Sequence, residues 1–137
     1  MSFNNNVKHI SLLTNLVSLN INVTKIKQVE IINLINLTTL YLFSNSYIND
    51  IKHLTNLTFL NAGSSNIKQD SIDKLTNLIH LDIFNNTHIT NINHLHNLLS
   101  LNISCDSNID VTSVPTINKF HPKEFIYYMT TLAKKLD

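Results

Sequence analysis

The chain has 137 residues, which is enough for one domain with a continuous core. Its formal net charge is +1, and all ten basic residues are lysines. A nearly neutral chain without arginine lacks the usual groups for bidentate recognition of phosphates and bases, so no nucleic-acid partner is expected. No apolar run approaches the ~18 residues of a membrane span, so no membrane partner is expected either.

A four-residue unit, L-T-N-L, recurs along the chain. It occurs at 13–16, 54–57 and 75–78, and in changed form at 34–37 and 95–98. Its asparagine lies at positions 15, 36, 56, 77 and 97, at steps of 21, 20, 21 and 20 residues. A fixed period near 20 residues predicts a solenoid, in which each repeat buries its core against its neighbours.

The first twelve residues match the second half of a repeat. Val7, Ile10 and Leu13 have the same spacing as apolar residues of later repeats. We therefore interpret 1–12 as a partial repeat without a polar capping element. Three alternatives stay open: residues 1–6 cover the end of the core, the end meets a partner, or part of the natural chain is missing.

Five repeats follow, over 13–111. Each contains L-x-x-L-x-L, and its last two apolar positions alternate with polar or aromatic residues, which predicts a short strand with one buried face. The return legs carry the apolar residues Ile26/Val29, Ile48/Ile51, Ile67/Ile72, Ile89/Ile92 and Ile109/Val111. The wider spacing in the third repeat predicts a short helical turn capped by Asp70 or Ser71, whereas the other legs suit a 3₁₀ or extended path.

The repeat pattern fades after Ile109. Pro122 suits the first turn of a helix, and apolar residues at helical spacing follow it to Leu136. Residues 112–137 are therefore expected to form a C-terminal cap with a helix over about 122–136. The alternative is an amphipathic helix that binds a partner.

The repeat L-x-x-L-x-L-x-x-N-x-I resembles the leucine-rich repeat family, and its L-T-N-L phrasing is similar to short-repeat classes such as the internalins. The resemblance implies one α/β solenoid domain over 1–137, an arc with a short-stranded parallel sheet on its concave side and 3₁₀ or extended segments on its convex side. The asparagine position of the family falls on Thr24, Asn45, Ser65, Asn86 and Asp106. Because only two of these are asparagine, we expect an irregular ladder of turn-stabilising bonds.

The outward strand positions line the sheet, and we call this surface the concave face. Aromatic residues on a rigid sheet are good anchors for a partner. The candidate partner-binding residues are Tyr41, Phe43, Phe59, Asn61, His80, Asp82 and Phe84. Gly63 is expected to leave a gap between Phe43 and Phe84. Partial cover by loops, or by the aromatic rings themselves, is the competing interpretation.

No catalytic, cofactor-binding or metal-binding residues are expected. His80 and Asp82 share one face but have no aligned nucleophile. His94 and His96 flank a core leucine and lack further ligands in register. The sequence favours a non-catalytic module that binds a protein or peptide on the concave face. The alternative is a structural subunit or homo-oligomer that docks through its N-terminal end, and the oligomeric state is left open.

The expected location is intracellular and cytoplasmic. Cys105 is the single cysteine, so no internal disulfide can form, and the N-terminus has no apolar leader. Heavy use of Asn, Ile and Lys indicates an AT-rich genome, which includes a viral protein acting in host cytoplasm.

Overall fold

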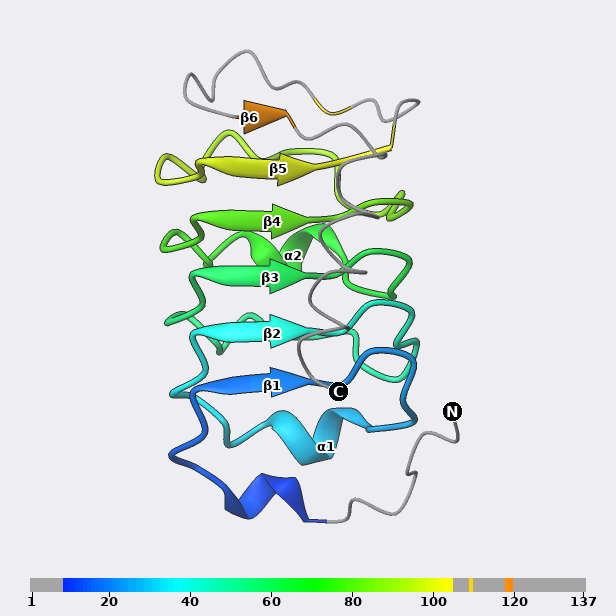
Figure 1. The fold of residues 1–137 in the computed structure, drawn as a ribbon, viewed down its shortest axis with the longest axis vertical. Helices are drawn as coiled ribbons and strands as arrows, with labels where there is room; N and C mark the ends of the chain where they lie inside the picture. The colour runs from blue at the N-terminus through cyan, green and yellow to red at the C-terminus, as the bar shows by residue number, and fades with distance from the viewer. Residues whose placement is uncertain (1–8, 105–108, 110–117, 120–137) are drawn as a thin grey trace, which may run out of the picture.

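The computed structural model describes residues 9–104, Ile109, and the backbone of 118 and 119. A short 3₁₀ helix, η1 (Ile10–Leu12), is followed by a six-stranded parallel sheet in which strand order equals chain order. The elements are β1 (Ser18–Asn20), α1 (Gln28–Ile31), β2 (Thr39–Tyr41), β3 (Phe59–Asn61), α2 (Gln69–Ile72), β4 (His80–Asp82), β5 (Ser100–Asn102) and β6 (Asn118–Lys119). Figure 1 shows the strands stacked in one column with α2 behind them, which is the predicted solenoid.

The core is a set of aligned leucine and isoleucine rows. Leu34, Leu54, Leu75 and Leu95, which begin successive repeats, are 0% exposed, as are most other inward-facing apolar residues. Leu13 holds the same position in the first repeat and is 54% exposed. A core row therefore needs a coil on both sides to leave water completely.

The alternation of 21- and 20-residue steps reflects two kinds of return leg. Both 21-residue repeats contain a one-turn α-helix, α1 or α2, whereas the return legs at 47–53 and 88–94 contain no helix. The structural unit is therefore a pair of repeats 41 residues long. The helical turn expected in the third repeat is present as α2.

The first return leg differs from the sequence interpretation. It was expected to be 3₁₀ or extended with Val29 in the core, but it forms α1, Val29 is 64% exposed, and Ile31 is buried. The spacing of Ile26, Ile31 and Leu34 equals the 67, 72, 75 spacing that predicted α2, so this signal was available. The expected caps are also wrong, because Lys68 occupies the N-cap of α2 and no side chain bonds there.

Glutamines at the first position of each helix clamp the next repeat. The Gln69 side chain accepts hydrogen bonds from the backbone N–H of Thr90 (2.9 Å) and Asn91 (3.0 Å), and donates to the Asn91 carbonyl (2.7 Å). Gln28 makes the same three bonds to Asn49 and Asp50. These bonds hold a non-helical return leg in place, since such a leg has no internal backbone bonds.

Histidines of the non-helical legs lie against the helix ends. A ring nitrogen of His53 is 3.4 Å from the Ile31 carbonyl, and one of His94 is 3.1 Å from the Ile72 carbonyl. These carbonyls end α1 and α2, where hydrogen-bond donors are favoured. Both histidines are half-buried rather than fully solvated.

The unbroken asparagine row links repeats. Its side-chain amides donate to carbonyls of the preceding repeat: Asn36 to Thr14 (2.9 Å), Asn56 to Ile35 (3.0 Å), Asn77 to Thr55 (3.0 Å) and Asn97 to Thr76 (3.1 Å). The sequence indicated a turn with local bonds, but these bonds join coils about 20 residues apart. The row therefore stabilises stacking.

The second polar row alternates regularly. The hydroxyls of Thr24 and Ser65 donate within their own repeats, to the carbonyls of Ile21 and Ala62. Asn86 reaches back to two carbonyls of the preceding repeat, at 3.1 and 3.2 Å, and Asn45 makes longer contacts of the same kind. Hydroxyl and amide alternate with the same 41-residue unit, so the expected irregularity is a regular two-repeat pattern.

The sheet extends past the fifth repeat. Ser100 of β5 pairs with Asn118 of β6, a step of 18 residues, which the sequence did not predict because no leucine triplet marks it. The C-terminal helix expected over about 122–136, Asp106 and Cys105 lie outside the described residues. Within the described ranges, no helix is long and apolar enough to cross a membrane.

Candidate functional site

The concave face is built from three rows of outward side chains in register. The first strand position carries Ser18, Thr39, Phe59, His80 and Ser100; the third carries Asn20, Tyr41, Asn61, Asp82 and Asn102; the next outward position carries Asn22, Phe43, Gly63, Phe84 and Ser104. Parallel pairing places each residue beside its equivalent at the inter-strand spacing, about 4.8 Å. The face is therefore a rigid grid of short ladders.

Three rings form a connected strip across β2, β3 and β4. The Tyr41 and Phe59 rings have centroids 4.8 Å apart and are tilted by 39°, and Phe59 and His80 follow at 5.8 Å and 38°. Tyr41 and Phe59 are half-buried and His80 is exposed. We call these three residues the aromatic strip. It offers π-faces and two polar groups on a backbone that cannot shift independently.

The gap expected at Gly63 is closed. A Cβ at Gly63 would lie 3.0 Å from Cδ2 of the Phe43 ring and 3.0 Å from the Phe84 carbonyl oxygen. Glycine is thus needed here for the close approach of Phe43, and its φ is not positive. Phe43 and Phe84 are both half-buried at the edge of the patch.

Asn61 and Asp82 are 1% and 4% exposed and bind each other. The Asn61 amide donates to one Asp82 carboxylate oxygen (3.1 Å), and the Phe84 N–H donates to the other (3.0 Å). The Asn61 oxygen accepts from the Gly63 N–H (3.2 Å). These two residues, placed by sequence among the partner-binding residues, lie beneath the aromatic strip and fix the ends of β3 and β4.

Burial raises the pKa of the Asp82 carboxyl above its ordinary value, while hydrogen bonds from Phe84 and the nearby Asn102 amide oppose this rise. Asn102 is 5% exposed, and its amide nitrogen and oxygen form no well-directed hydrogen bond within the described residues. We give more weight to the geometry, which places Asn102 beside Asp82 without a formed bond. Sequence reasoning missed Asn102, although it follows Asn61 and Asp82 in the same row.

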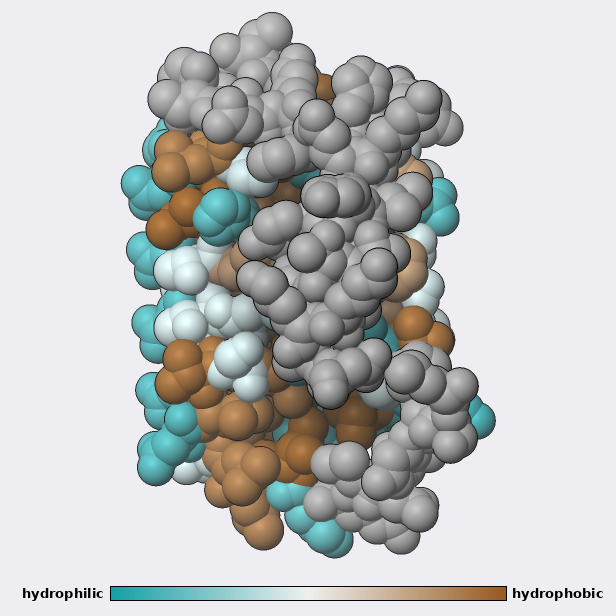
Figure 2. Space-filling view, viewed as in Figure 1, coloured by the Kyte–Doolittle hydropathy of each residue, from teal (hydrophilic) through white to brown (hydrophobic). Residues whose placement is uncertain are grey.

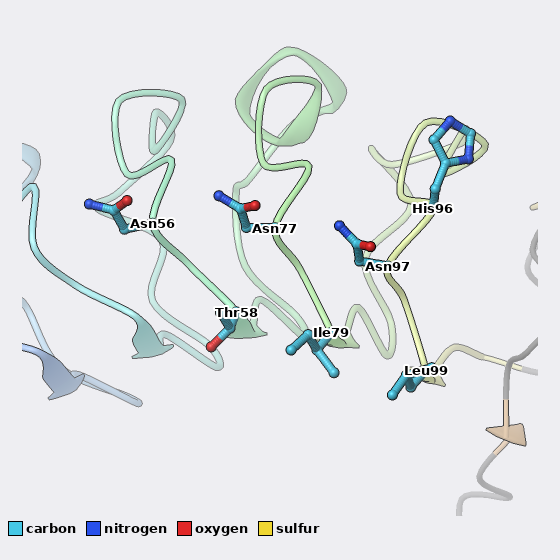
Figure 3. A pocket seen from close by; sticks show the side chains of 7 residues that line it. All are labelled: Asn56, Thr58, Asn77, Ile79, His96, Asn97 and Leu99. Carbon is cyan, nitrogen blue, oxygen red and sulfur yellow. The ribbon is translucent and has the colours of Figure 1, made fainter.

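A shallow groove of about 540 Å³ lies away from the concave face, at the amino ends of β3, β4 and β5 (Figure 3). Its lining residues are Asn56, Thr58, Asn77, Ile79, His96, Asn97 and Leu99. Three of these are the asparagines whose amides already donate to the preceding repeat. The groove is thus the outer surface of the stacking row.

The remaining polar candidates do not assemble. His94 lies against α2, His96 lines the groove, and Leu95 between them is fully buried. Across the described ranges, no three His, Cys, Asp or Glu side chains gather as a metal site would require. The geometry supports non-covalent recognition.

Comparison with known proteins agrees with this architecture. An internalin from Listeria monocytogenes superposes with a TM-score of 0.67 at 30% sequence identity, over 80% of this chain and 36% of the internalin chain. This chain therefore spans about a third of the length of the internalin that it matches. No family model matches the sequence, and no curated protein does.

The leucine rows, the single parallel sheet and this similarity define the class of protein: the chain belongs to the leucine-rich repeat family. Within that family, its short repeats are similar to those of the internalin. Leucine-rich repeat solenoids are, in general, scaffolds for protein–protein interaction.

Proposed function

We propose that the concave face binds a protein or peptide, with the aromatic strip as its anchor. The observation that supports this most is the exposure of connected rings on a rigid sheet. Aromatic residues in such settings dominate binding energies at interfaces, because they bury large areas with little loss of side-chain freedom. Phe43 and Phe84 extend the apolar area, while Asn61 and Asp82 hold the strand ends beneath it.

The test compares partner capture by the wild type, a Tyr41→Ala/Phe59→Ala variant and a Tyr47→Ala control. Tyr47 is 45% exposed and lies outside the strands, so its loss removes a surface aromatic without touching the concave face. We expect quantitative mass spectrometry of captured proteins to show a partner lost only with the double variant. Affinity for that partner should fall by tenfold or more, since hot-spot truncation costs about 2 kcal/mol or more. A folded double variant that retains every partner would refute the proposal.

A second candidate function is supported by a different observation. The core leucines of the first repeat are incompletely covered, as the 54% exposure of Leu13 shows. We propose that the N-terminal end is itself a docking end, so that the protein acts as a structural subunit or homo-oligomer. Sedimentation analysis tests this directly, because a docking end without a partner should drive self-association or the capture of another protein.

We further propose that the protein acts in a reducing, intracellular compartment, because its one cysteine leaves the stack without internal disulfides. Localisation of the tagged full-length chain tests this, and recovery from the secreted fraction would contradict it.

A further inference from the structure

Exposed apolar side chains are concentrated at one end of the molecule. Of the nine large hydrophobic residues that are exposed in the described part of the chain, seven lie between residues 12 and 35. Figure 2 shows this hydrophobic surface in the lower part of the view, around β1 and α1. The seven residues are Leu12, Leu13, Val17, Val23, Val29, Ile32 and Ile35, and we call them the end patch.

The 41-residue unit provides an internal reference for this patch. Moving forward by 41 residues replaces Val29 with Asp70 and Ile32 with Asp73, both of them exposed. The same step takes Leu12, Val17, Val23 and Ile35 to His53, Thr58, Ser64 and Thr76. The fold thus accepts polar residues at these positions. Apolar residues appear there only in the first coil, which marks a contact surface rather than a requirement of the repeat.

The same end carries an open sheet edge. In β2, the equivalent edge groups are bonded to the coil below: the Thr39 N–H donates to Val17 (3.1 Å), and the Tyr41 carbonyl accepts from Ile21 (2.8 Å). Their equivalents in β1, the Ser18 N–H and the Asn20 carbonyl, face the open side and pair with no strand among the described residues. An open edge next to apolar surface is a template for adding a strand.

Charge points to the kind of strand that it adds. Residues 10–24 contain no charged side chain, although proteins usually place lysine or another charge on an exposed edge. A two-fold interface sets each residue near its own copy, so any charge at its centre would face a like charge. The nearest charges, Lys25, Lys27 and Glu30, include both signs. An uncharged, self-complementary end therefore suits a second copy of the same chain.

We propose that two copies of this chain associate through their N-terminal ends, with β1 of one pairing antiparallel to β1 of the other. The two-fold axis passes near Leu19, so that Ser18 of each copy bonds Asn20 of the other. The two end patches meet, and the partly exposed leucines of the first repeats form one continuous core. This inference rests on the second candidate function, the docking end, and names its partner.

The test uses multi-angle light scattering and sedimentation on the full chain over a range of concentrations, together with amide hydrogen exchange. The wild type should be a dimer. Ser18→Lys should be a monomer, because it brings like charges together at the edge. Val29→Asp/Ile32→Asp should also weaken the dimer, and it should fold because Asp70 and Asp73 hold the equivalent positions. Ser100→Lys, the matching change on β5, should remain a dimer.

Other outcomes overturn the proposal in distinguishable ways. A wild-type monomer with a rapidly exchanging Ser18 amide would leave a docking end that takes a different partner. A monomer with that amide protected would show that the same chain covers the edge, and would also refute the docking end. Assemblies that grow beyond a dimer, or a dimer unaffected by both end variants, would exclude the two-fold β1 contact.

Discussion

At the scale of single residues, the most informative feature is a row of left-handed backbone positions that follows the strands. Val23, Ser44, Ser64 and Asn85 have φ of 54°, 54°, 49° and 56°. Small polar residues tolerate this conformation, whereas a β-branched side chain is strained in it. Val23 is therefore the costly member of a row that turns the chain out of each strand.

We expect Val23→Asn to stabilise the fold by about 1 kcal/mol, because asparagine relieves a strain of that order. Denaturant unfolding measures the gain, and it should be carried out in the Ser18→Lys background so that self-association does not contribute. The reciprocal change Asn85→Val should cost a similar amount. Loss of stability in Val23→Asn would show that Val23 packing outweighs its backbone strain.

A second prediction at this scale concerns the buried carboxyl of Asp82. Its pKa in the folded chain lies above the ordinary value of 3.8, mainly because of burial, so ionisation disfavours the folded state. The contribution of this group to stability is complete below the ordinary pKa and is lost as pH rises through the folded-state pKa.

The measurement is the difference in unfolding free energy between wild type and Asp82→Asn across that pH window. Asparagine loses one accepted hydrogen bond, which gives an offset that does not depend on pH. Relative to the variant, wild type should weaken as pH rises. A flat difference would mean that Asp82 titrates as an ordinary carboxyl.

At the scale of elements, stability comes from bonds that cross between a helical and a non-helical repeat. Glutamine clamps run forward from α1 and α2, and histidines of the next leg reach back to the helix ends. Each non-helical leg is thus held by its neighbour on the N-terminal side. The helices are only one turn long, and an isolated turn does not persist in water.

We therefore expect Gln69→Ala to lower the unfolding free energy by about 1 kcal/mol, since it leaves the Thr90 and Asn91 backbone groups without their partner. Hydrogen exchange should speed up selectively at these two amides. Lys68→Ala, next to it and exposed, serves as the matched control with little effect. Equal exchange in both variants would show that the clamp adds nothing beyond solvation.

At the scale of the whole molecule, the chain is a stack of two-repeat units with one exposed end. Sequence periodicity predicted the solenoid, the strands and the core rows, because leucines at fixed steps leave few ways to bury them together. It also located every outward position of the concave face from β1 to β5. These features depend on local spacing, which can be followed directly along the chain.

The remaining features depend on contacts between repeats. The burial of Asn61 and Asp82 arises from packing around the row, and the sequence showed only that they point outward. The bonds of the asparagine row could not be assigned to the preceding coil from one repeat alone. By contrast, α1 and the 41-residue alternation were visible in the unequal steps and were missed because each leg was interpreted separately.

The central claim is that the aromatic strip contacts a protein partner, and site-specific photo-crosslinking tests it most directly. A photoreactive phenylalanine analogue replaces Phe59 in one sample and Tyr47 in the other, and irradiation is carried out in the presence of the partner identified by capture. We predict a covalent adduct from position 59 and none from position 47. An adduct from position 47 alone, or equal adducts from both, would contradict recognition by the concave face.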